Sequence, residues 1–234
     1  RTVSAAPVAG AAPARATRGT VADDRRRHIF EAACQVLAKK GFANASIREV
    51  AAASGMPVPT MYQYIQSKED LLLLIYQHFM RDVGRSMQAA ITAGAPAHEN
   101  LEQLVRTMLE VYNANQKYIR LMFQETKSLP PEMRRIVFDI DGQNIAIVRN
   151  LLAECREAGV AEFDNDEIAA NLVYFVCTIW ALRHWTLGKH RRAAVDQAVL
   201  DFIERGLAVR QGGARRAEAA RRNGRSAPTR RRHG

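Results

Sequence analysis

Cysteine is scarce in this chain, which has three cysteines among 234 residues and no Cys-x-x-Cys pair. An odd count without such a pair indicates neither a disulfide framework nor a cysteine zinc cluster. A reducing cytoplasm fits this composition, and we expect the protein there. The first residues also lack an apolar signal core, so we expect no export signal.

Long apolar runs and catalytic motifs are missing as well. The longest apolar run, Leu172 to Leu182, includes Thr178 and is well short of the roughly 20 residues that cross a bilayer. No G-x-S-x-G, Walker loop, H-E-x-x-H, or G-x-G-x-x-G after a strand occurs. We therefore expect no membrane segment, no enzyme activity and no cofactor.

Clustered metal ligands are not evident in the sequence either. The six histidines are scattered, and His184 and His190 would lie on different faces of a helix, so a metal site is not expected. We interpret Asp139 and Asp141 as part of a solvated helix face rather than as a pair of catalytic acids.

Acidic residues are rare at both ends of the chain. The net charge is +3 over residues 1–22, +3 over 23–68, −5 over 69–204 and +9 over 205–234. The basic first quarter indicates an anionic partner such as nucleic acid, whereas the acidic middle argues against a uniformly basic scaffold protein. The tails, 1–22 and 211–234, have no apolar periodicity, and we expect them to be disordered.

Strand-like alternation is absent too, and the apolar residues between the tails recur at helical spacing. We therefore predict an all-α protein. The expected helices lie near 23–40, 46–55, 57–65, 67–93, 97–115, 116–128, 131–158, 165–187 and 192–210. The natural domain boundary falls in the fourth helix, which gives an N-terminal three-helix domain at 23–70 and a larger helical domain at 71–210.

Two short helices separated by Gly55 follow a longer supporting helix, which is the pattern of a helix-turn-helix. Ser46 and Glu49 form a capping box at the start of the first short helix. The apolar face of the second short helix should pack inward, and it consists of Val58, Met61 and Ile65. The opposite face has donors and acceptors but no acid, and it consists of Thr60, Gln63, Tyr64 and Ser67. A helix that enters a major groove needs such a face, because phosphates repel carboxylates.

Residues 24 to 72 resemble the DNA-binding domain of the TetR family of bacterial transcriptional regulators. They run from the basic start of the first helix through the stretch "GFANASIREVAAASGMPVPTMYQYIQSKEDLL". The sequence departs from the usual family wording at Ser54, Pro57, Pro59 and Ile65. Proline is acceptable in the first turn of a helix, where its missing N–H has no partner in the helix. The resemblance implies the helix-turn-helix fold and leaves the base specificity open.

The resemblance also implies roles for individual residues. The groove-facing residues would be Ser46, Ile47, Arg48, Val58, Pro59, Thr60, Gln63 and Tyr64. Tyr62 and Lys68 would reach phosphates. Two of these assignments have alternatives, because Arg48 could be a solvated helix charge and Tyr62 could chiefly pack between helices. The cluster Arg25-Arg26-Arg27 could either touch phosphate or only solvate the first helix.

For the larger domain, the family resemblance implies ligand sensing and dimerisation. The segment 165–187 is apolar nearly all round its middle, so we expect it to be buried on several sides, one of them by a partner subunit. With the amphipathic segment 192–210 it would form a four-helix dimer interface. A twofold dimer would place two recognition helices about 34 Å apart, which implies a palindromic operator.

The stretches "YIRLMFQETKSLP" and "WALRHW" resemble a subgroup of the family whose effectors are often acyl-CoA thioesters. An apolar tunnel would take the acyl chain, and an arginine would meet phosphate or carboxylate groups. The expected ligand contacts are Arg120, Leu121, Met122, Phe123, Gln124, Tyr174, Trp180 and Arg183. As an alternative, the aromatic and Met residues could be ordinary core, and Trp180 and Trp185 could pack a dimer interface.

These observations together predict a homodimeric TetR-like repressor. It would bind a palindromic double-stranded DNA operator and be released by a small ligand such as an acyl-CoA thioester. Two alternatives stay open. One is a helical ligand-binding or carrier protein with a vestigial DNA-binding domain. The other is a sequence-indifferent DNA-binding protein driven by the Arg-rich tails.

Overall fold

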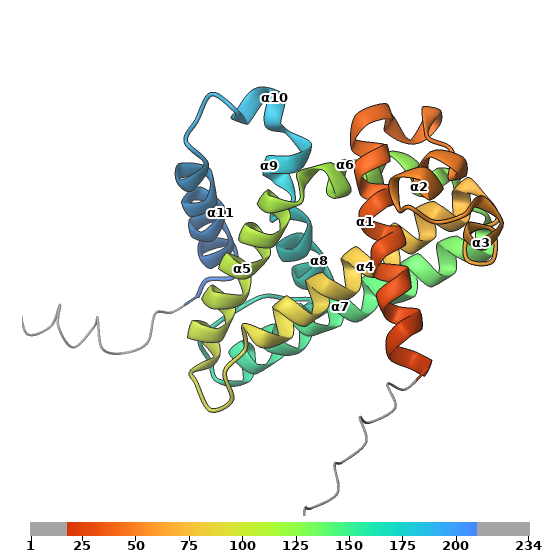
Figure 1. Ribbon diagram of the computed structural model, residues 1–234. Helices are drawn as coiled ribbons and strands as arrows, with labels where there is room; N and C mark the ends of the chain where they lie inside the picture. Colours follow the sequence, from red (N-terminus) through yellow and green to blue (C-terminus); the bar gives the residue numbers. More distant parts are fainter. Residues whose placement is uncertain (1–17, 210–234) are drawn as a thin grey trace, which may run out of the picture. The chain divides into compact units, whose positions relative to one another are not determined.

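The computed structural model describes residues 18–209, so the expected tail at 211–234 and residues 1–17 of the expected N-terminal tail lie outside this range. Residues 18–22 belong to a helix, so the expectation of disorder is wrong there. Every regular element in the described range is helical, which confirms the all-α prediction (Figure 1). The elements are α1 Arg18–Asn44, α2 Ile47–Ala53, α3 Val58–Met61, α4 Lys68–Ala89, α5 Ala97–Ala114, α6 Gln116–Glu125, the 3-10 helix η1 Thr126–Ser128, α7 Pro131–Glu157, α8 Asp166–Val176, α9 Ile179–Leu182, α10 His184–Leu187 and α11 Arg192–Gly206.

The chain divides into two compact units between Leu74 and Ile75. This division and the domain boundary that we expected at residue 70 both lie within α4. No helix among residues 18–209 is long and apolar enough to cross a membrane.

The first unit is built around α1, against which α2 packs, and α3 in turn packs on α2. Ile29 and Ala33 of α1 are fully buried, as are Val50 and Ala51 of α2. The helical course of α1 is interrupted at Gly41, whose φ of 73° lies in the left-handed region that glycine adopts without strain. The expected stop at this glycine is therefore confirmed, although α1 begins earlier than we expected, at Arg18.

The third helix is shorter than the predicted 57–65 and covers only Val58–Met61. Beyond Met61 the backbone continues as hydrogen-bonded turns, in which the amides of Tyr64 and Ile65 both donate to the Met61 carbonyl at 2.9 and 3.0 Å. Of the three residues predicted to pack inward, Met61 and Ile65 are buried and Val58 is half-buried. Their burial provides the packing that so short a helix needs, since isolated helices of this length are unstable in water.

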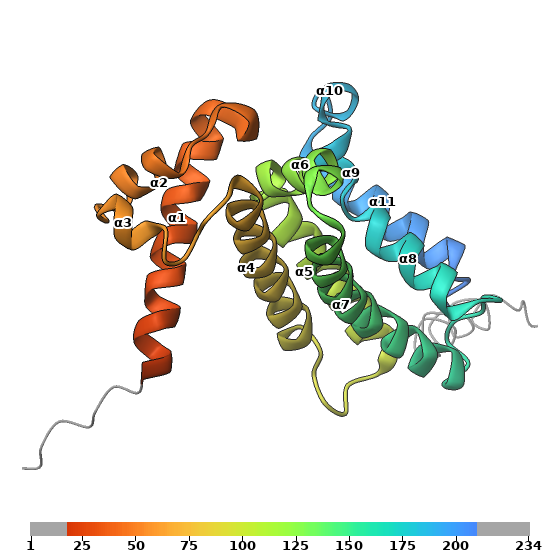
Figure 2. The ribbon, with the colours of Figure 1, turned by 90° about the vertical axis from the view of Figure 1, so that its right-hand side faces the viewer.

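The second unit surrounds an apolar core to which α4, α5, α7, α8 and α11 contribute (Figure 2). Tyr76 of α4 is buried near the end of α6, where its hydroxyl donates to the Met122 carbonyl at 2.8 Å and lies 2.7 Å from the Thr126 hydroxyl. Burial raises the pKa of Tyr76 to about 12, so this hydroxyl keeps its proton and remains a donor.

The predicted continuous helix at 165–187 is wrong, because the structure breaks it into α8, α9 and α10. At the first break, the Thr178 amide donates to the Phe175 carbonyl at 3.0 Å, and the Thr178 hydroxyl donates to the same oxygen at 2.7 Å. The Thr178 hydroxyl thus competes with main-chain amides of a continuing helix for the Phe175 carbonyl oxygen. At the second break, Arg183 has φ −121° and ψ 22°, which lies outside the helical region.

In a single chain this segment is also less buried than we expected. Three large apolar residues of α8 are mostly exposed, namely Ile168, Leu172 and Phe175. Their spacing of four and three residues puts them on one face of the helix. One face of α8 is therefore uncovered in a single chain.

Candidate nucleic-acid interface

The turn between α2 and α3 is fixed by its backbone and by one histidine of α1. Gly55 has φ 62°, and the next amide, that of Met56, donates to the Ala51 carbonyl at 2.9 Å. This left-handed glycine ends α2 and redirects the chain into α3. The His28 ring nitrogen Nε2 lies 2.9 Å from the Ser54 carbonyl oxygen and donates to it when that nitrogen is protonated. The supporting helix is thereby joined to the turn.

The start of α2 is held by a capping box. The Glu49 amide donates to Ser46 Oγ at 3.3 Å, and the Ser46 amide donates to Glu49 Oε2 at 3.0 Å. A hydrogen bond from Lys40 and a second one from the Ser46 hydroxyl lower the pKa of Glu49, so the capping carboxylate stays ionised. The predicted capping box is confirmed.

The three residues proposed for DNA contact at this helix start differ in their surroundings. Ser46 is half-buried, and its hydroxyl takes part in the capping box. Ile47 is buried and packs inward. Arg48 is exposed, and no acidic residue among those with described side chains, 24–37 and 39–209, forms an ion pair with it. Of the three, Arg48 has the side chain most available for an anionic partner.

The outward surface of α3 and its following turn is polar and carries no acid. Pro59, Tyr62 and Gln63 are exposed, and Val58, Thr60 and Tyr64 are half-buried. The structure thus brings the predicted residues of α3 onto one short, accessible segment. Their contact with DNA remains a prediction.

An arginine that we had assigned either to phosphate or to solvent instead contacts the recognition segment. Arg25 Nη1 of α1 donates to the Tyr64 hydroxyl oxygen at 3.2 Å. A guanidinium can only donate, so the tyrosine oxygen is the acceptor here and its own hydrogen stays available for another acceptor. Arg25 therefore orients Tyr64 and places a positive charge beside it.

Lys68, which we expected at a phosphate, also has a structural contact. Its Nζ donates to the Ala43 carbonyl at 2.6 Å and lies 5.3 Å from the centre of the Phe42 ring. The lysine at the first position of α4 thus binds an otherwise free carbonyl at the end of α1. An ammonium group has three donors, so two are left for a phosphate.

This contact predicts a stability effect for Lys68→Met. Losing a charge-assisted hydrogen bond at a half-exposed site should lower the free energy of unfolding by about 1 kcal/mol. The measurement is chemical denaturation of the full chain. Lys39→Met is the matched control, because Lys39 is exposed on α1 and should tolerate the change. Equal stability of the two variants would refute the structural role of Lys68.

The residues predicted to contact a ligand do not share one environment. Trp180 is buried against His184 at a ring distance of 5.0 Å, and Tyr174 is half-buried. Arg120 is exposed and reaches the Ala181 carbonyl at 3.4 Å. The remaining expected contacts are half-buried at Leu121 and Met122 and exposed at Phe123, Gln124 and Arg183.

Two of these exposed residues are engaged with aromatic neighbours rather than with a common pocket. The Phe123 ring lies 5.9 Å from the Phe175 ring, and the Arg183 guanidinium lies 5.0 Å from the Trp185 ring. The predicted ligand set therefore stays a prediction, and Trp180 is its one buried member.

The prediction that Asp141 belongs to a solvated face is wrong. Asp139 is exposed, but Asp141 is half-buried, and its loss of solvent raises the pKa of its carboxyl. The sequence does contain a signal for this placement. Asp141 precedes buried Asn144 by three residues and buried Val148 by seven, so it shares their helix face.

Comparison with known protein families places both parts of the chain. Residues 29–75 match the family described as bacterial regulatory proteins, tetR family. Residues 94–207 match the tetracyclin repressor-like C-terminal domain. The chain therefore belongs to the TetR family and is a DNA-binding transcriptional regulator.

Individual relatives are distant. The HTH-type transcriptional regulator HbdR from Aromatoleum sp. (strain CIB) is 23% identical over 186 residues, which are 79% of this chain and 78% of HbdR. The crystal structure of FadR from Bacillus subtilis in complex with stearoyl-CoA has a TM-score of 0.62 at 21% identity, covering 76% of this chain and 96% of FadR. AibR in complex with isovaleryl coenzyme A and operator DNA has a TM-score of 0.63 at 19% identity, covering 75% and 96%.

Proposed function

We propose that this regulator is a homodimeric repressor that occupies a palindromic DNA operator and leaves it when a small ligand binds. The observation that carries the proposal is the exposed, acid-free polar surface of α3 and the turn that follows it, anchored by buried Met61 and Ile65. Base edges in a major groove are read by hydrogen bonds from such side chains, and phosphates do not repel them.

The exposed residues of this surface suit different parts of a duplex. The Gln63 amide can donate to and accept from one adenine edge at the same time. Arg48 suits a guanine edge or a phosphate, and Tyr64, oriented by Arg25, can donate its hydroxyl hydrogen to a phosphate or base acceptor. Gln63 is therefore the residue to which we assign most of the base discrimination.

The uncovered face of α8 supports a dimer. Ile168, Leu172 and Phe175 of α8 are 60%, 64% and 57% exposed, and Phe202 of α11 is 68% exposed. Large contiguous apolar surfaces of this kind mark interaction sites. A second copy is the occupant we propose, since a twofold dimer would cover the same face of each chain and give four packed helices.

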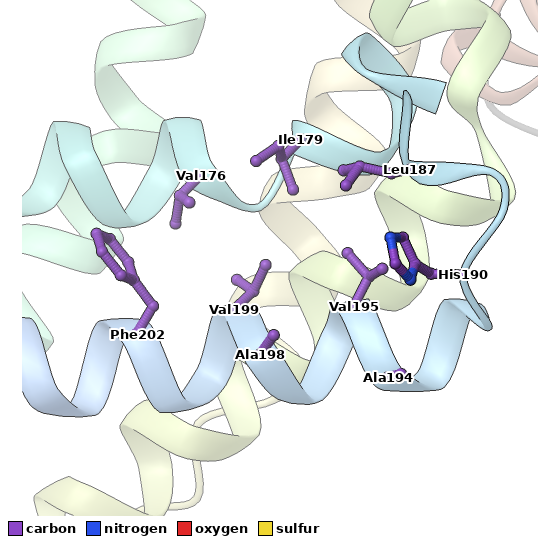
Figure 3. Close-up of a pocket in the computed structure, with 9 residues that line it drawn as sticks. All are labelled: Val176, Ile179, Leu187, His190, Ala194, Val195, Ala198, Val199 and Phe202. Atoms are coloured by element: carbon purple, nitrogen blue, oxygen red, sulfur yellow. The ribbon is translucent and has the colours of Figure 1, made fainter. Parts of the chain in front are cut away.

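An apolar groove of about 450 Å³ lies between α11 on one side and the end of α8, α9 and α10 on the other. Figure 3 shows Val176 and Ile179 on one side of the groove and Val195, Val199 and Phe202 on the other. The groove offers space for side chains of the partner copy between the two helices. Two copies joined in this way would present two recognition segments to a palindromic operator.

For the effector we propose an acyl-CoA thioester. The stretches of α6 and α9–α10 that resemble the acyl-CoA-responsive subgroup support this, as do the two structural neighbours that hold stearoyl-CoA and isovaleryl-CoA. The ligand can release the operator only through its preference for the conformation that does not bind DNA. A coupling of about 1–3 kcal/mol gives a roughly 5- to 150-fold change in operator affinity, which is enough for a switch.

A gel-shift titration of the full chain on the duplex from its own upstream region tests this proposal. Stearoyl-CoA or isovaleryl-CoA should weaken the complex by a factor within the range above. If the protein shifts no such duplex at moderate salt, the alternative of a ligand carrier with a vestigial DNA-binding domain is favoured. If it binds the operator but neither thioester acts, the effector class is wrong while the DNA-binding function stands.

Deleting residues 211–234 separates specific binding from binding by the Arg-rich tail. We expect operator discrimination to survive, with a shallower dependence of affinity on salt, because each lost phosphate contact reduces the slope by about 0.9. The measurement is operator affinity from low to high salt for the full and shortened chains. Loss of all discrimination on deletion would instead support a sequence-indifferent DNA-binding protein.

A further inference from the structure

A basic surface surrounds an exposed tryptophan of the second unit. Trp185 of α10 is 74% exposed, more than any other large hydrophobic residue with a described side chain. The Arg183 guanidinium lies over its ring, 5.0 Å from the ring centre. Residues 183–192, which we call the basic loop, contain no acid, although residues 69–204 as a whole carry a net charge of −5. Its further bases are Lys189, Arg191 and Arg192.

Most charges of the basic loop are not neutralised by the protein. Arg192 pairs with Asp196 at 3.4 Å. In the part of the chain whose side chains are described, no acid forms an ion pair with Arg183, Lys189 or Arg191. All three are exposed. A local group of positive charges on an acidic domain attracts an anionic partner to this one place.

The backbone of the basic loop is held in a defined turn. The Gly188 amide donates to the His184 carbonyl at 2.7 Å, and the His190 amide donates to the Leu187 carbonyl at 2.9 Å. A Cβ atom on Gly188 would come within 2.7 Å of the His184 oxygen, so the turn requires glycine. The His184 ring packs on buried Trp180, with ring centres 5.0 Å apart. The loop is therefore anchored to the core.

A second element, α6, brings another arginine to the same place. Arg120 Nη1 donates to the Ala181 carbonyl at 3.4 Å, two residues before Arg183. Its other contact is with the uncharged Gln116 side chain, at 3.4 Å. A guanidinium has five donors, so several stay available for a ligand. Arg120 and Arg183 lie in the two stretches of sequence that resemble the acyl-CoA-responsive subgroup.

These side chains define the chemistry of a matching ligand. Guanidinium groups bind phosphate oxygens through paired hydrogen bonds, and a tryptophan ring stacks on a flat base. Coenzyme A carries an adenine ring and phosphate groups at the end opposite to its acyl group. Duplex DNA fits less well because its base faces are stacked inside the helix. A partner subunit also fits less well, since the cores of protein interfaces are depleted of charged residues.

We propose that the basic loop and Arg120 bind the nucleotide end of the effector. The adenine stacks on the face of Trp185 opposite Arg183, and the phosphates pair with Arg183 and Arg120. Lys189 and Arg191 add the charge that attracts the phosphates. This inference rests on the proposed acyl-CoA effector, and it assigns the nucleotide end of that ligand to an outer surface of the domain.

Thioesters with and without the nucleotide test this inference on the full chain. Isovaleryl-CoA is compared with isovaleryl-pantetheine, and stearoyl-CoA with stearoyl-pantetheine, by calorimetric titration. In at least one pair the CoA thioester should bind roughly 10-fold tighter or more, the size expected for one stacked base. Trp185→Ala and Arg183→Gln should each weaken binding of that CoA thioester by about fivefold or more. Neither change should alter the affinity for the pantetheine thioester.

Phe138→Ala and Arg149→Gln are the matched controls, because they remove an exposed aromatic ring and an exposed guanidinium of α7, outside the basic loop. Both should bind all four thioesters as the wild type does. Trp185→Ala should keep the oligomeric state of the wild type in light scattering, since the proposed partner of Trp185 is a ligand and not a second copy.

The possible failures are distinguishable. Equal affinity for both members of each pair, or unchanged binding of CoA thioesters by Trp185→Ala and Arg183→Gln, would overturn the nucleotide site and leave the acyl-CoA effector standing. Conversion of Trp185→Ala to a monomer would instead assign this surface to the dimer. Weaker binding of unrelated duplexes, with thioester binding unchanged, would assign it to DNA. If the operator is bound but no thioester of either kind binds, the proposed effector class and this inference both fall.

Discussion

Replacing Leu172 by Arg is expected to convert the protein into a monomer and to weaken operator binding by roughly 10²- to 10⁴-fold. Leu172 lies in the middle of the exposed apolar face of α8. In the proposed dimer its replacement would bury two unpaired charges close to each other, which is strongly unfavourable. The loss in DNA affinity has the stated size because two linked half-site contacts become one. Light scattering after size-exclusion chromatography gives the oligomeric state, and a gel shift gives the affinity.

Gln88→Arg is the control for added charge, because Gln88 is exposed on α4 and does not belong to the α8–α11 face. It should remain dimeric and keep its operator affinity. A Leu172→Arg protein that stayed dimeric would show that the subunits associate through another surface.

The second large effect is expected for Gln63→Ala. A good contact with a base edge contributes about 1–3 kcal/mol of discrimination, and a dimer makes it twice, so the variant should lose about 2–6 kcal/mol of specific binding energy. Its affinity for unrelated duplexes should change little, since phosphate contacts determine that part. Competition between operator and unrelated DNA measures the ratio directly.

Gln66→Ala is the control for this experiment, because Gln66 carries the same side chain and is exposed just beyond the α3 segment. It should retain discrimination. Undiminished discrimination by the Gln63→Ala protein would move the reading of bases to other residues, of which Arg48 and Tyr64 are the next candidates.

The local features of the DNA-binding unit could be predicted from the sequence because they depend on neighbouring residues. The capping box needs only Ser46 and Glu49, three positions apart. The stop at Gly41 needs only a residue that tolerates positive φ. The burial of Met61 and Ile65 was predicted from their helical spacing, and it holds although Ile65 lies in the turns after α3.

Contacts between distant residues could not be predicted in this way. Lys68 and Ala43 are 25 residues apart, and Arg25 and Tyr64 are 39 apart, so both contacts depend on how the helices pack. Each changes the interpretation of a predicted DNA contact, because the side chain is also held by the protein. The prediction of secondary structure had a similar limit at Thr178. There one side-chain hydrogen bond accompanies a helix break that apolar periodicity does not reveal.

The surroundings of Asp141 in the second unit illustrate the same limit. The pattern of α7 places Asp141 on the face of buried Asn144 and Val148, which the sequence could have indicated. Its proximity to Tyr174 of α8 and the edge-to-face contact of Tyr174 with Tyr112 are properties of the folded unit.

The most direct test of the central claim is a hydroxyl-radical footprint of the full chain on the duplex upstream of its own gene. We predict two protected stretches related by twofold symmetry, with centres about one helical turn, or 10 to 10.5 base pairs, apart. The Gln63→Ala protein should lose this pattern at the same concentration. Uniform protection along the duplex, or no protection by the wild-type chain, would contradict a regulator that reads a palindromic operator through α3.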